Sequence, residues 1–337
     1  LDTFINLTGL NEAKTLLMSS GEENKNLKTC ENLWGQLSEL GADRNSVLIN
    51  LGGGVVTDLG GFVACTFKRG IDFYNVPTTL LAMVDASVGG KTGIDLGPLK
   101  NQIGIIKEPI NVILDSQWLN TLPPNELRSG FAEMLKHGLI ADRSYWNQLK
   151  SLEHLEKTII SKFMKPSLSI KKSVVTKDPE EKNLRKILNF GHTFGHAIEA
   201  HHGYKKITHG AAITMGMVIA AKVSLFEGHI KDQQLENIIS LIKSLGLIGV
   251  TKSLFNMPLL LYSTILKPEP AILKFIIMKA NNPGNKKSIY LWGRAFTSSS
   301  CKSNRGSIFR IFLSTDKSEV SIARWITLTC LVCEAST

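Results

Sequence analysis

The segment Val47-Leu48-Ile49-Asn50-Leu51-Gly52-Gly53-Gly54 sets the architecture of the first part of the chain. A short apolar run bounded by glycines predicts a buried strand. Three glycines after a strand let backbone N–H groups approach a pyrophosphate that any Cβ atom would hold away. Asp58 follows within about one helical turn, where its carboxylate could accept a ribose hydroxyl or cap the helix. A glycine run is also a common tight turn, so both interpretations stay open at this point.

Two familiar nucleotide-binding patterns are absent from the glycine segments. Gly52-x-Gly54 would start a G-x-G-x-x-G fingerprint, but Thr57 occupies its last position. Gly90-Lys91-Thr92 resembles the end of a P-loop, but Asp85 stands where that loop requires its first glycine. These substitutions exclude an ordinary Rossmann turn and a P-loop ATPase.

The hydrophobic periodicity predicts an α/β domain followed by a mostly helical one. Further strands are predicted at residues 71–76 and 111–115. After Pro123 the period becomes helical, and helices are predicted at 124–137, 151–175, 191–200, 210–227 and 231–245. We therefore predict an α/β domain over residues 1–117, a helical domain over 118–280 and an atypical basic tail over 281–337.

The composition of the 337-residue chain limits its class and its partners. With 43% hydrophobic and 20% charged residues, the chain has enough apolar residues for a core and is not mainly disordered. The net charge is +10, and half of it lies in residues 281–337, which carry eight basic against three acidic residues. This balance suits an anionic metabolite. No nucleic-acid recognition motif accompanies the 7% aromatic content, so we expect no nucleic-acid partner.

The cysteine count argues against a disulfide-stabilised protein, and the lengths of the apolar runs argue against a membrane-spanning one. Five cysteines are few and odd in number, which disfavours a disulfide scaffold, and Cys330 and Cys333 form a lone C-x-x-C with no second pair. Residues 211–226 are the most apolar stretch, but Lys222 interrupts them, so we predict a buried helix and no membrane partner. Because the chain begins with Leu1, we expect a fragment or a processed form.

Histidines and carboxylates form the clearest chemical pattern. His192 and His196 are four residues apart and so share one helical face, and His209 follows at a predicted helix start. Glu133 and Lys136 lie three apart on another helix. Two histidines and one glutamate with an open fourth position form a catalytic zinc set, although an H-x-x-x-H pair is more often a solvated pair. The pattern suggests a metalloenzyme for an anionic small molecule, with these candidate basic groups: Lys91, Lys100, Lys136, Lys171 and Arg185.

Taken together, the motifs resemble those of the 3-dehydroquinate synthase family of sugar-phosphate cyclases. The order and spacing of the matching strings cover about residues 19–228. The strings are Ser20-Gly-Glu-Glu-Asn-Lys25, Gly52-Gly-Gly-Val-Val-Thr-Asp-Leu-Gly-Gly-Phe62, Val76-Pro-Thr-Thr-Leu-Leu-Ala-Met-Val-Asp-Ala-Ser-Val-Gly-Gly-Lys-Thr-Gly-Ile-Asp95, Lys100-Asn101, Thr121-Leu-Pro, Ser129-Gly-Phe-Ala-Glu-Met-Leu-Lys136 and Leu188 through Glu199.

The resemblance implies an α/β N-terminal NAD-binding domain, a mostly α-helical C-terminal metal-binding domain and a homodimer. It implies three metal ligands, Glu133, His192 and His209, usually for zinc, with cobalt as a substitute. The residues it assigns to NAD are Glu22, Lys25, Gly53, Gly54, Val55, Asp58, Thr78, Thr79, Asp85, Lys100, Thr121, Leu122 and Glu126. Those it assigns to the substrate pocket are Lys91, Asn101, Lys136, Lys171, Arg185, Asn189 and His196, with Arg69 lent across the dimer interface.

The reaction implied by the resemblance belongs to the shikimate pathway. It converts 3-deoxy-D-arabino-heptulosonate 7-phosphate, a small anionic sugar phosphate, to 3-dehydroquinate and phosphate. NAD transiently oxidises one hydroxyl, phosphate is eliminated, the hydride returns, and an aldol closure forms the ring. We expect His196 to assist proton transfer, and Lys136 and Arg185 to orient the substrate. A cytoplasmic location is expected, or a plastid one if the source is a plant or alga.

Departures from the family pattern keep other interpretations open. Several dozen residues usually precede the position of Leu1. Ala211 stands where the family commonly has glutamate, and Lys279-Ala280-Asn281 follows Met278 where the family has Asp-Lys-Lys. The alternatives are a sister sugar-phosphate cyclase, an NAD-dependent polyol dehydrogenase that releases NADH, a catalytically impaired relic, and a nucleic-acid binder that uses the basic tail.

Overall fold

The computed structural model describes residues 2–97, 99–202, 207–248, 307–312 and 325–330. It divides into two compact units, Leu1–Gly130 and Phe131–Thr337. The sequence placed this boundary near residue 117. The residues between belong to the first unit, and at its end Gly130 packs so closely that a Cβ atom there would lie only 2.5 Å from the backbone nitrogen of Leu81.

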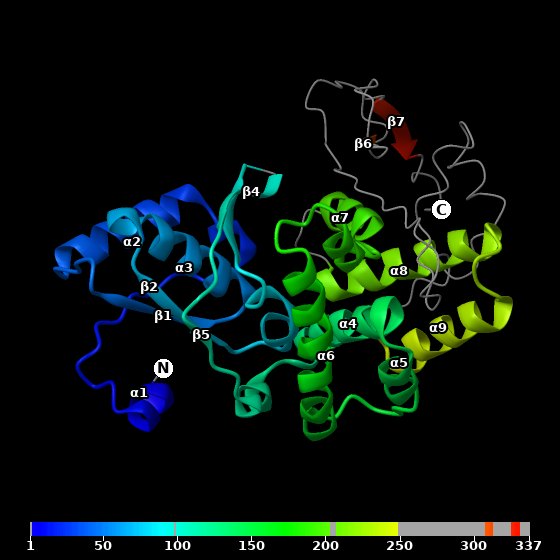
Figure 1. The fold of residues 1–337 in the computed structure, drawn as a ribbon, viewed down its shortest axis with the longest axis horizontal. Helices are drawn as coiled ribbons and strands as arrows, with labels where there is room; N and C mark the ends of the chain where they lie inside the picture. The colour runs from blue at the N-terminus through cyan, green and yellow to red at the C-terminus, as the bar shows by residue number, and fades with distance from the viewer. Residues whose placement is uncertain (1, 98, 203–206, 249–306, 313–324, 331–337) are drawn as a thin grey trace, which may run out of the picture. The chain divides into compact units, whose positions relative to one another are not determined.

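Parallel strands form the sheet of the first unit (Figure 1). β1 (Val47–Gly52) pairs with β2 (Asp72–Pro77), starting at Val47 opposite Asp72, and β2 pairs with β5 (Asn111–Val112). The predicted strand at 111–115 is thus shorter than expected. Its end turns away because the Asp115 carboxylate accepts the backbone N–H of Gln117 at 2.8 Å and caps the 3₁₀ helix η4 (Ser116–Thr121).

Helix α3 (Gly54–Thr66) packs directly on this sheet through glycines. A Cβ atom on Gly60 would lie 2.0 Å from Oδ1 of Asn50 in β1, and one on Gly61 would lie 3.3 Å from the ring of Phe73 in β2. Helix α2 (Leu27–Glu39) covers α3 in turn, with Asn26 as its N-cap. Leu33, Leu37, Leu59, Val63, Phe73 and Ile94 belong to the resulting core.

An antiparallel hairpin completes the first unit and was not predicted. β3 (Lys91–Leu96) pairs with β4 (Leu99–Ile106). Gly93 and Gly104 face each other, and a Cβ atom on Gly104 would lie 2.2 Å from the carbonyl oxygen of Thr92. The glycines therefore permit close strand approach. Short helical segments connect these elements: α1 (Asp2–Thr8), η1 (Glu22–Asn24), η2 (Phe67–Arg69) and the π-helical η3 (Ala82–Ala86).

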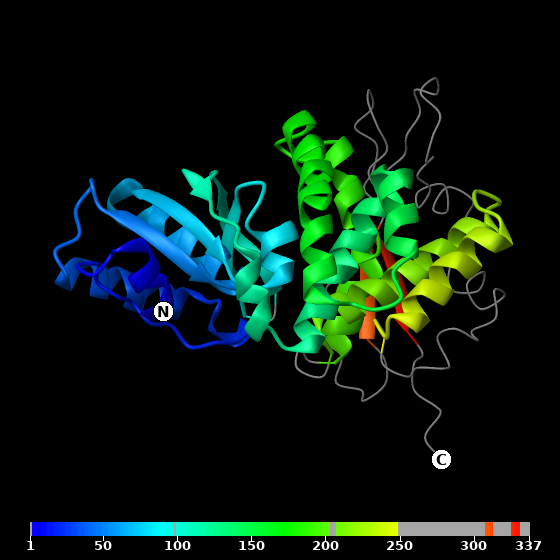
Figure 2. The same ribbon diagram turned by 90° about the horizontal axis from the view of Figure 1, so that it is seen from below.

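Helices make up most of the described second unit, as the sequence predicted (Figures 1 and 2). They are α4 (Pro124–Ala141, which begins in the first unit), α5 (Arg143–Lys150), α6 (Lys157–Lys177), η5 (Leu184–Asn189), α7 (His192–His201), α8 (His209–Phe226) and α9 (Asp232–Ser244). The helix predicted over 151–175 begins later, after Glu156. Asp142 caps α5 through the N–H of Tyr145, and Thr208 caps α8 through that of Ala211.

Helix α8 is long and apolar enough to cross a membrane by length and composition, with a mean hydropathy of 1.4 over 18 residues. In this structure most of the helix is buried inside the second unit, including Lys222. The buried helix predicted over 211–226 is therefore confirmed.

The predicted basic tail is described only where β6 (Ser307–Phe312) pairs antiparallel with β7 (Trp325–Cys330). Cys330 ends β7. Cys333, the second cysteine of the C-x-x-C pair, and the segment 278–287, where the sequence departs from the family pattern, lie outside the described residues.

Candidate functional site

Glycines hold α7 and α8 in backbone contact. A Cβ atom on Gly216 of α8 would lie 2.0 Å from the carbonyl oxygen of Gly191, and one on Gly195 would lie 2.5 Å from Ile213. Gly191, the residue before α7, has φ of 81°, a conformation that favours glycine. The contact brings the histidines of α7 close to the first residue of α8.

The three histidines gather into one cluster with a glutamate of α4. The ring centroids of His192, His196 and His209 lie 5.3–5.8 Å apart. Nε2 of His192 lies 3.7 Å, and Nε2 of His209 3.6 Å, from Oε1 of Glu133. The candidate ligand atoms of Glu133, His192 and His209 all lie within 4.8 Å of one another. The structure thus brings together the three predicted metal ligands.

The donor set fits a zinc or cobalt ion. Two imidazole nitrogens and one carboxylate oxygen are a common catalytic zinc set. Glu133 is fully buried, and the ammonium of Lys136 forms an ion pair with its other oxygen, Oε2. The carboxylate of Glu133 is therefore held in place by burial and by the ion pair with Lys136.

The pKa values of the two histidines in this set are shifted in opposite directions. Burial and the positive charge of Lys136 lower the pKa of His192 to about 3. Burial alone would also lower the pKa of His209, but its contacts with Glu133 and Glu199 raise it to about 9. His192 therefore offers a neutral nitrogen at neutral pH, whereas His209 must release a proton when a metal binds.

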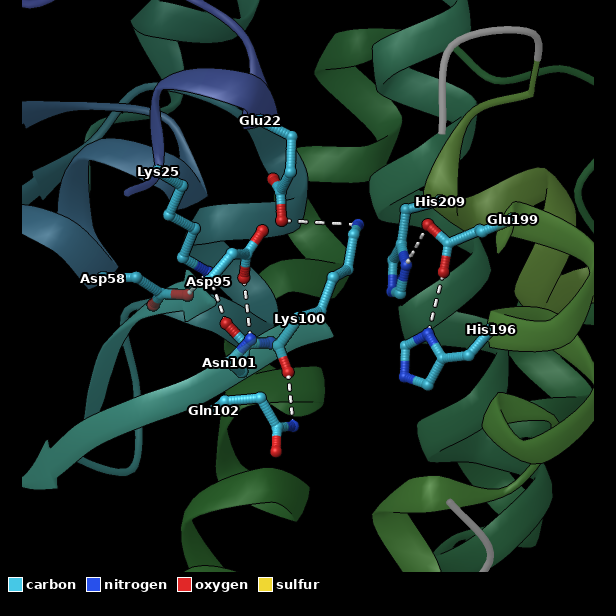
Figure 3. A network of polar contacts seen from close by, with 10 residues as sticks. All are labelled: Glu22, Lys25, Asp58, Asp95, Lys100, Asn101, Gln102, His196, Glu199 and His209. Atoms are coloured by element: carbon cyan, nitrogen blue, oxygen red, sulfur yellow. Dashed lines mark hydrogen bonds and ion pairs between the residues drawn. The ribbon is translucent and has the colours of Figure 1, made fainter. Parts of the chain in front are cut away.

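Glu199 of α7 joins two histidines, a role that the sequence did not predict. Its Oε2 lies 2.8 Å from Nδ1 of His196, and its Oε1 lies 3.2 Å from Nδ1 of His209 (Figure 3). The side chain is only 4% exposed, while that of His196 is 46% exposed. The signal in the sequence was the spacing of three residues between His196 and Glu199, which places both on one helical face.

The other predicted substrate groups of the second unit lie in α6 and η5, where both cations are buried and Asn189 is half-buried. Lys171 is buried in α6. Arg185 in η5 is buried, and its guanidinium donates to the carbonyl of Pro179 at 2.8 Å. The amide of Asn189 donates to Glu181 at 2.8 Å. The structure thus ties Arg185 and Asn189 to the segment before η5.

In the first unit, the glycine segment forms the turn into α3. Thr78 donates its N–H to the carbonyl of Gly52 at 2.9 Å, which joins the ends of β1 and β2. Cβ atoms on Gly53 and Gly54 would lie 3.1 Å from Thr79 and 3.3 Å from Ala86. Gly53 is the N-cap and supplies no capping side chain, so the first backbone amides of α3 suit a pyrophosphate.

Asp58 forms an ion pair in this structure, and its predicted contact with the ribose of NAD stays a prediction. Its carboxylate accepts from Nζ of Lys25 at 2.6 Å, and the same ammonium donates to Oδ1 of Asn101 at 2.6 Å (Figure 3). Burial would lower the pKa of Lys25, which is 4% exposed, but Asp58 and Glu22 raise it above its usual value. Asp58 thus compensates a buried charge and is not a helix cap.

This network also fixes the β3–β4 hairpin. Asn101 has φ of 51°, and its backbone N–H donates to the carboxylate of Asp95 at 2.7 Å. The backbone N–H of Asp95 donates to the carbonyl of Lys25 at 2.8 Å. On the same hairpin, Lys100 pairs with Glu22 at 3.3 Å. Residues predicted to hold NAD and substrate therefore bind each other here.

The remaining predicted residues of the first unit are spread over its elements. Val55 is in α3, Asp85 in η3 and Lys91 at the exposed start of β3. Arg69 ends η2 with an exposed side chain and φ of 72°. Thr121, Leu122 and Glu126 lie at the end of η4, directly after it, and in the first turn of α4.

Comparisons with known families match most of the chain. Residues 15–129 match the family described as 3-dehydroquinate synthase N-terminal, and residues 130–262 match 3-dehydroquinate synthase C-terminal. The chain is 43% identical over 241 residues to 3-dehydroquinate synthase of Pelobacter propionicus, covering 70% of this chain and 67% of that protein. It is 45% identical over 235 residues to the enzyme of Thermoanaerobacter pseudethanolicus, covering 68% and 66%.

Solved structures with similar folds include two sugar-phosphate cyclases. A 2-deoxy-scyllo-inosose synthase complexed with carbaglucose-6-phosphate, NAD⁺ and Co²⁺ is 29% identical, with a TM-score of 0.67 over 73% of this chain and 71% of that one. The 2-epi-5-epi-valiolone synthase of Streptomyces hygroscopicus, solved with NAD⁺ and Zn²⁺, is 24% identical, with a TM-score of 0.67 over 74% of each chain, and supports the fold alone.

Proposed function

The chain belongs to the 3-dehydroquinate synthase family, and from that premise we propose that it converts 3-deoxy-D-arabino-heptulosonate 7-phosphate to 3-dehydroquinate and phosphate. The observation that carries the proposal is that the side chains of Glu133, His192 and His209 converge. The chain therefore has a metal-ligand set in addition to its sequence similarity to the family. The protein is therefore an NAD- and metal-dependent lyase of the shikimate pathway.

The two units supply sites for different cofactors. The turn from β1 into α3 would hold the pyrophosphate of NAD, and Glu133, His192 and His209 would hold zinc, which cobalt can replace. When bound, NAD supplies a hydride acceptor and donor, and the metal supplies a Lewis acid. The similar 2-deoxy-scyllo-inosose synthase, solved with NAD⁺ and Co²⁺, supports this pair of cofactors.

Basic groups and one accessible histidine provide the chemistry of the protein itself. The substrate carries a carboxylate and a phosphate, and the buried cations of Lys136, Lys171 and Arg185 can neutralise and orient such groups. His196 is accessible, and because Glu199 occupies its Nδ1, its Nε2 is the nitrogen that can exchange a proton with a ligand. We assign proton transfer to His196 and substrate orientation to the cations.

Phosphate release from the heptulosonate phosphate tests the proposal. Purified protein with NAD and zinc should release phosphate and form dehydroquinate in equal amounts, and a chelator should abolish both. His192→Ala should remove zinc-dependent turnover because it removes one metal ligand. As a matched control, His229→Ala changes an exposed histidine after α8 and should leave activity unchanged. A zinc-loaded, folded wild-type protein that releases no phosphate would refute the proposal.

A sister cyclase reaction is the second candidate, and the 29% identity to 2-deoxy-scyllo-inosose synthase favours it over a dehydrogenase. Turnover of glucose 6-phosphate, but not of the heptulosonate phosphate, would support it. A polyol dehydrogenase would instead accumulate NADH, which absorbs near 340 nm, whereas either cyclase regenerates NAD in each cycle.

We also propose that the protein is a homodimer in which Arg69 serves the partner's site. The support is the family resemblance and the exposed position of Arg69 at the end of η2. Mixing Arg69→Ala with His192→Ala chains should restore about a quarter of wild-type activity, because half of the dimers would be hybrids with one complete site. If Arg69 acts within its own chain, the mixture stays inactive.

A further inference from the structure

Glu199 is placed to control two histidines that have different proposed roles. It lies on α7, one turn after His196, and its two oxygens point to two different rings (Figure 3). Oε2 lies 2.8 Å from Nδ1 of His196, and Oε1 lies 3.2 Å from Nδ1 of His209. One buried carboxylate therefore serves both a candidate metal ligand and the candidate proton-transfer group.

The chemistry of a carboxylate decides which ring nitrogens carry hydrogen. An ionised carboxylate only accepts hydrogen bonds, so each neighbouring Nδ1 must be the donor. A neutral imidazole with its hydrogen on Nδ1 keeps the lone pair on Nε2. In His209 that Nε2 faces Glu133, at 3.6 Å from Oε1, where the candidate metal ligands converge. In His196 the accessible ring then carries its lone pair on Nε2.

We propose that Glu199 is a positioning residue that holds both His209 and His196 in the Nδ1–H form, which presents one Nε2 to the metal and the other to the substrate. This inference rests on the metal site of the proposed function. Carboxylates that orient metal-bound histidines in this way contribute about 10- to 100-fold to metal affinity. Here the same carboxylate also prepares a group that does not bind the metal.

The competing interpretation is a second metal ion. His196, Glu199 and His209 also lie close enough to hold one, with ligand atoms within 4.8 Å of each other. The short contact between His196 and Glu199 favours a hydrogen bond instead, since 2.8 Å is an ordinary distance for a charge-assisted N–H···O pair. The two interpretations differ in the number of zinc ions bound per chain.

The test compares Glu199→Gln and Glu199→Ala with wild type in the full chain. Zinc affinity is measured by competition with a chromophoric chelator, and zinc content by elemental analysis. Ring nitrogens of ¹⁵N-histidine in the zinc-loaded protein report the tautomers by NMR. Glu236→Gln, on the exposed face of α9, is the matched control because it makes the same change of charge away from the cluster.

We expect one zinc per wild-type chain and a loss of about 10- to 100-fold in zinc affinity in Glu199→Ala. Glu199→Gln keeps the shape of the side chain, but its amide can accept from only one ring and must donate to the other. One histidine should therefore change to the Nε2–H form. If that histidine is His196, kcat should fall by a larger factor than zinc affinity.

Other results would overturn the inference in distinguishable ways. If wild type binds one zinc and both variants match it in affinity and tautomers, Glu199 does not position the histidines, although the proposed function stands. Two zinc ions in wild type and one in Glu199→Ala would identify Glu199 as a ligand. A wild type that binds no zinc would remove the metal site itself, and this inference with it.

Discussion

Replacing Gly216 with alanine should separate α7 from α8 and weaken the metal site without changing any polar atom. The new Cβ atom would lie 2.0 Å from the carbonyl oxygen of Gly191, and it needs at least 3.0 Å, so the backbones must move apart by about 1 Å. Overpacking of this kind costs about 1–3 kcal/mol, of which the better helix propensity of alanine returns about 1 kcal/mol. Because the obstacle is backbone, which cannot rotate away, we expect a cost at the upper end of this range, about 3 kcal/mol, and so a net loss of about 2 kcal/mol in the free energy of unfolding.

The same shift should act on zinc binding. Metal–ligand distances tolerate about 0.2 Å, so moving His192 relative to His209 by about 1 Å should reduce zinc affinity at least about tenfold. The assays are urea unfolding followed by circular dichroism and chelator competition for zinc. Gly35→Ala is the matched control, because Gly35 is exposed in α2 with open space at its Cβ position, and it should gain about 0.5–1 kcal/mol. A Gly216→Ala protein as stable as Gly35→Ala, with wild-type zinc affinity, would refute the reasoning.

Three further predictions concern stability and reactivity. Lys25→Met should destabilise the protein at pH 8. Because the pKa of Lys25 is raised in the folded protein, its ion pair contributes fully to the free energy of unfolding below pH 10.5, and this contribution declines at higher pH. The difference in urea midpoint between Lys25→Met and wild type should therefore shrink in strong alkali. A difference that does not change with pH would contradict this. Burial raises the pKa of Cys30 to about 11, so peptide mapping after alkylation at pH 8 should find Cys30 unmodified in the folded protein and modified in urea. Asp178→Ala should cost about 1–3 kcal/mol, because both carboxylate oxygens accept backbone N–H groups, at 2.6 to 3.0 Å, from Lys182, Asn183 and Arg185; unchanged proteolysis of this segment would count against it.

Sequence periodicity was sufficient for the elements whose apolar pattern is clear. The strand at 47–51 and the helices at 191–200, 210–227 and 231–245 appear within a few residues of their predicted bounds. The β3–β4 hairpin was missed because glycines interrupt both strands and three exposed apolar residues, Leu96, Ile105 and Ile106, disturb the alternation.

The candidate site was predictable to the extent that residue type and spacing determine chemistry. His192 and His196 share a helical face because they are four residues apart, and the family resemblance supplied Glu133 and His209 as their partners. The pairing of Asp58 with Lys25 was not predictable from either source, since the two residues are 33 positions apart and belong to different elements. Glu199 ends the family-like segment that starts at Leu188, but only the structure shows that its carboxylate contacts two imidazole rings.

The Lys25 network also has a consequence for the order of folding. Its ammonium joins residues 33 and 76 positions along the chain, so forming the network closes large loops. Closing such loops costs chain entropy before any contact is gained, and contacts of this range slow folding. We therefore expect α2 and α3 to form early and the hairpin to dock on Lys25 late. Formation of the hydrogen bond between Lys25 and Asn101 would then be the last step in the folding of the first unit.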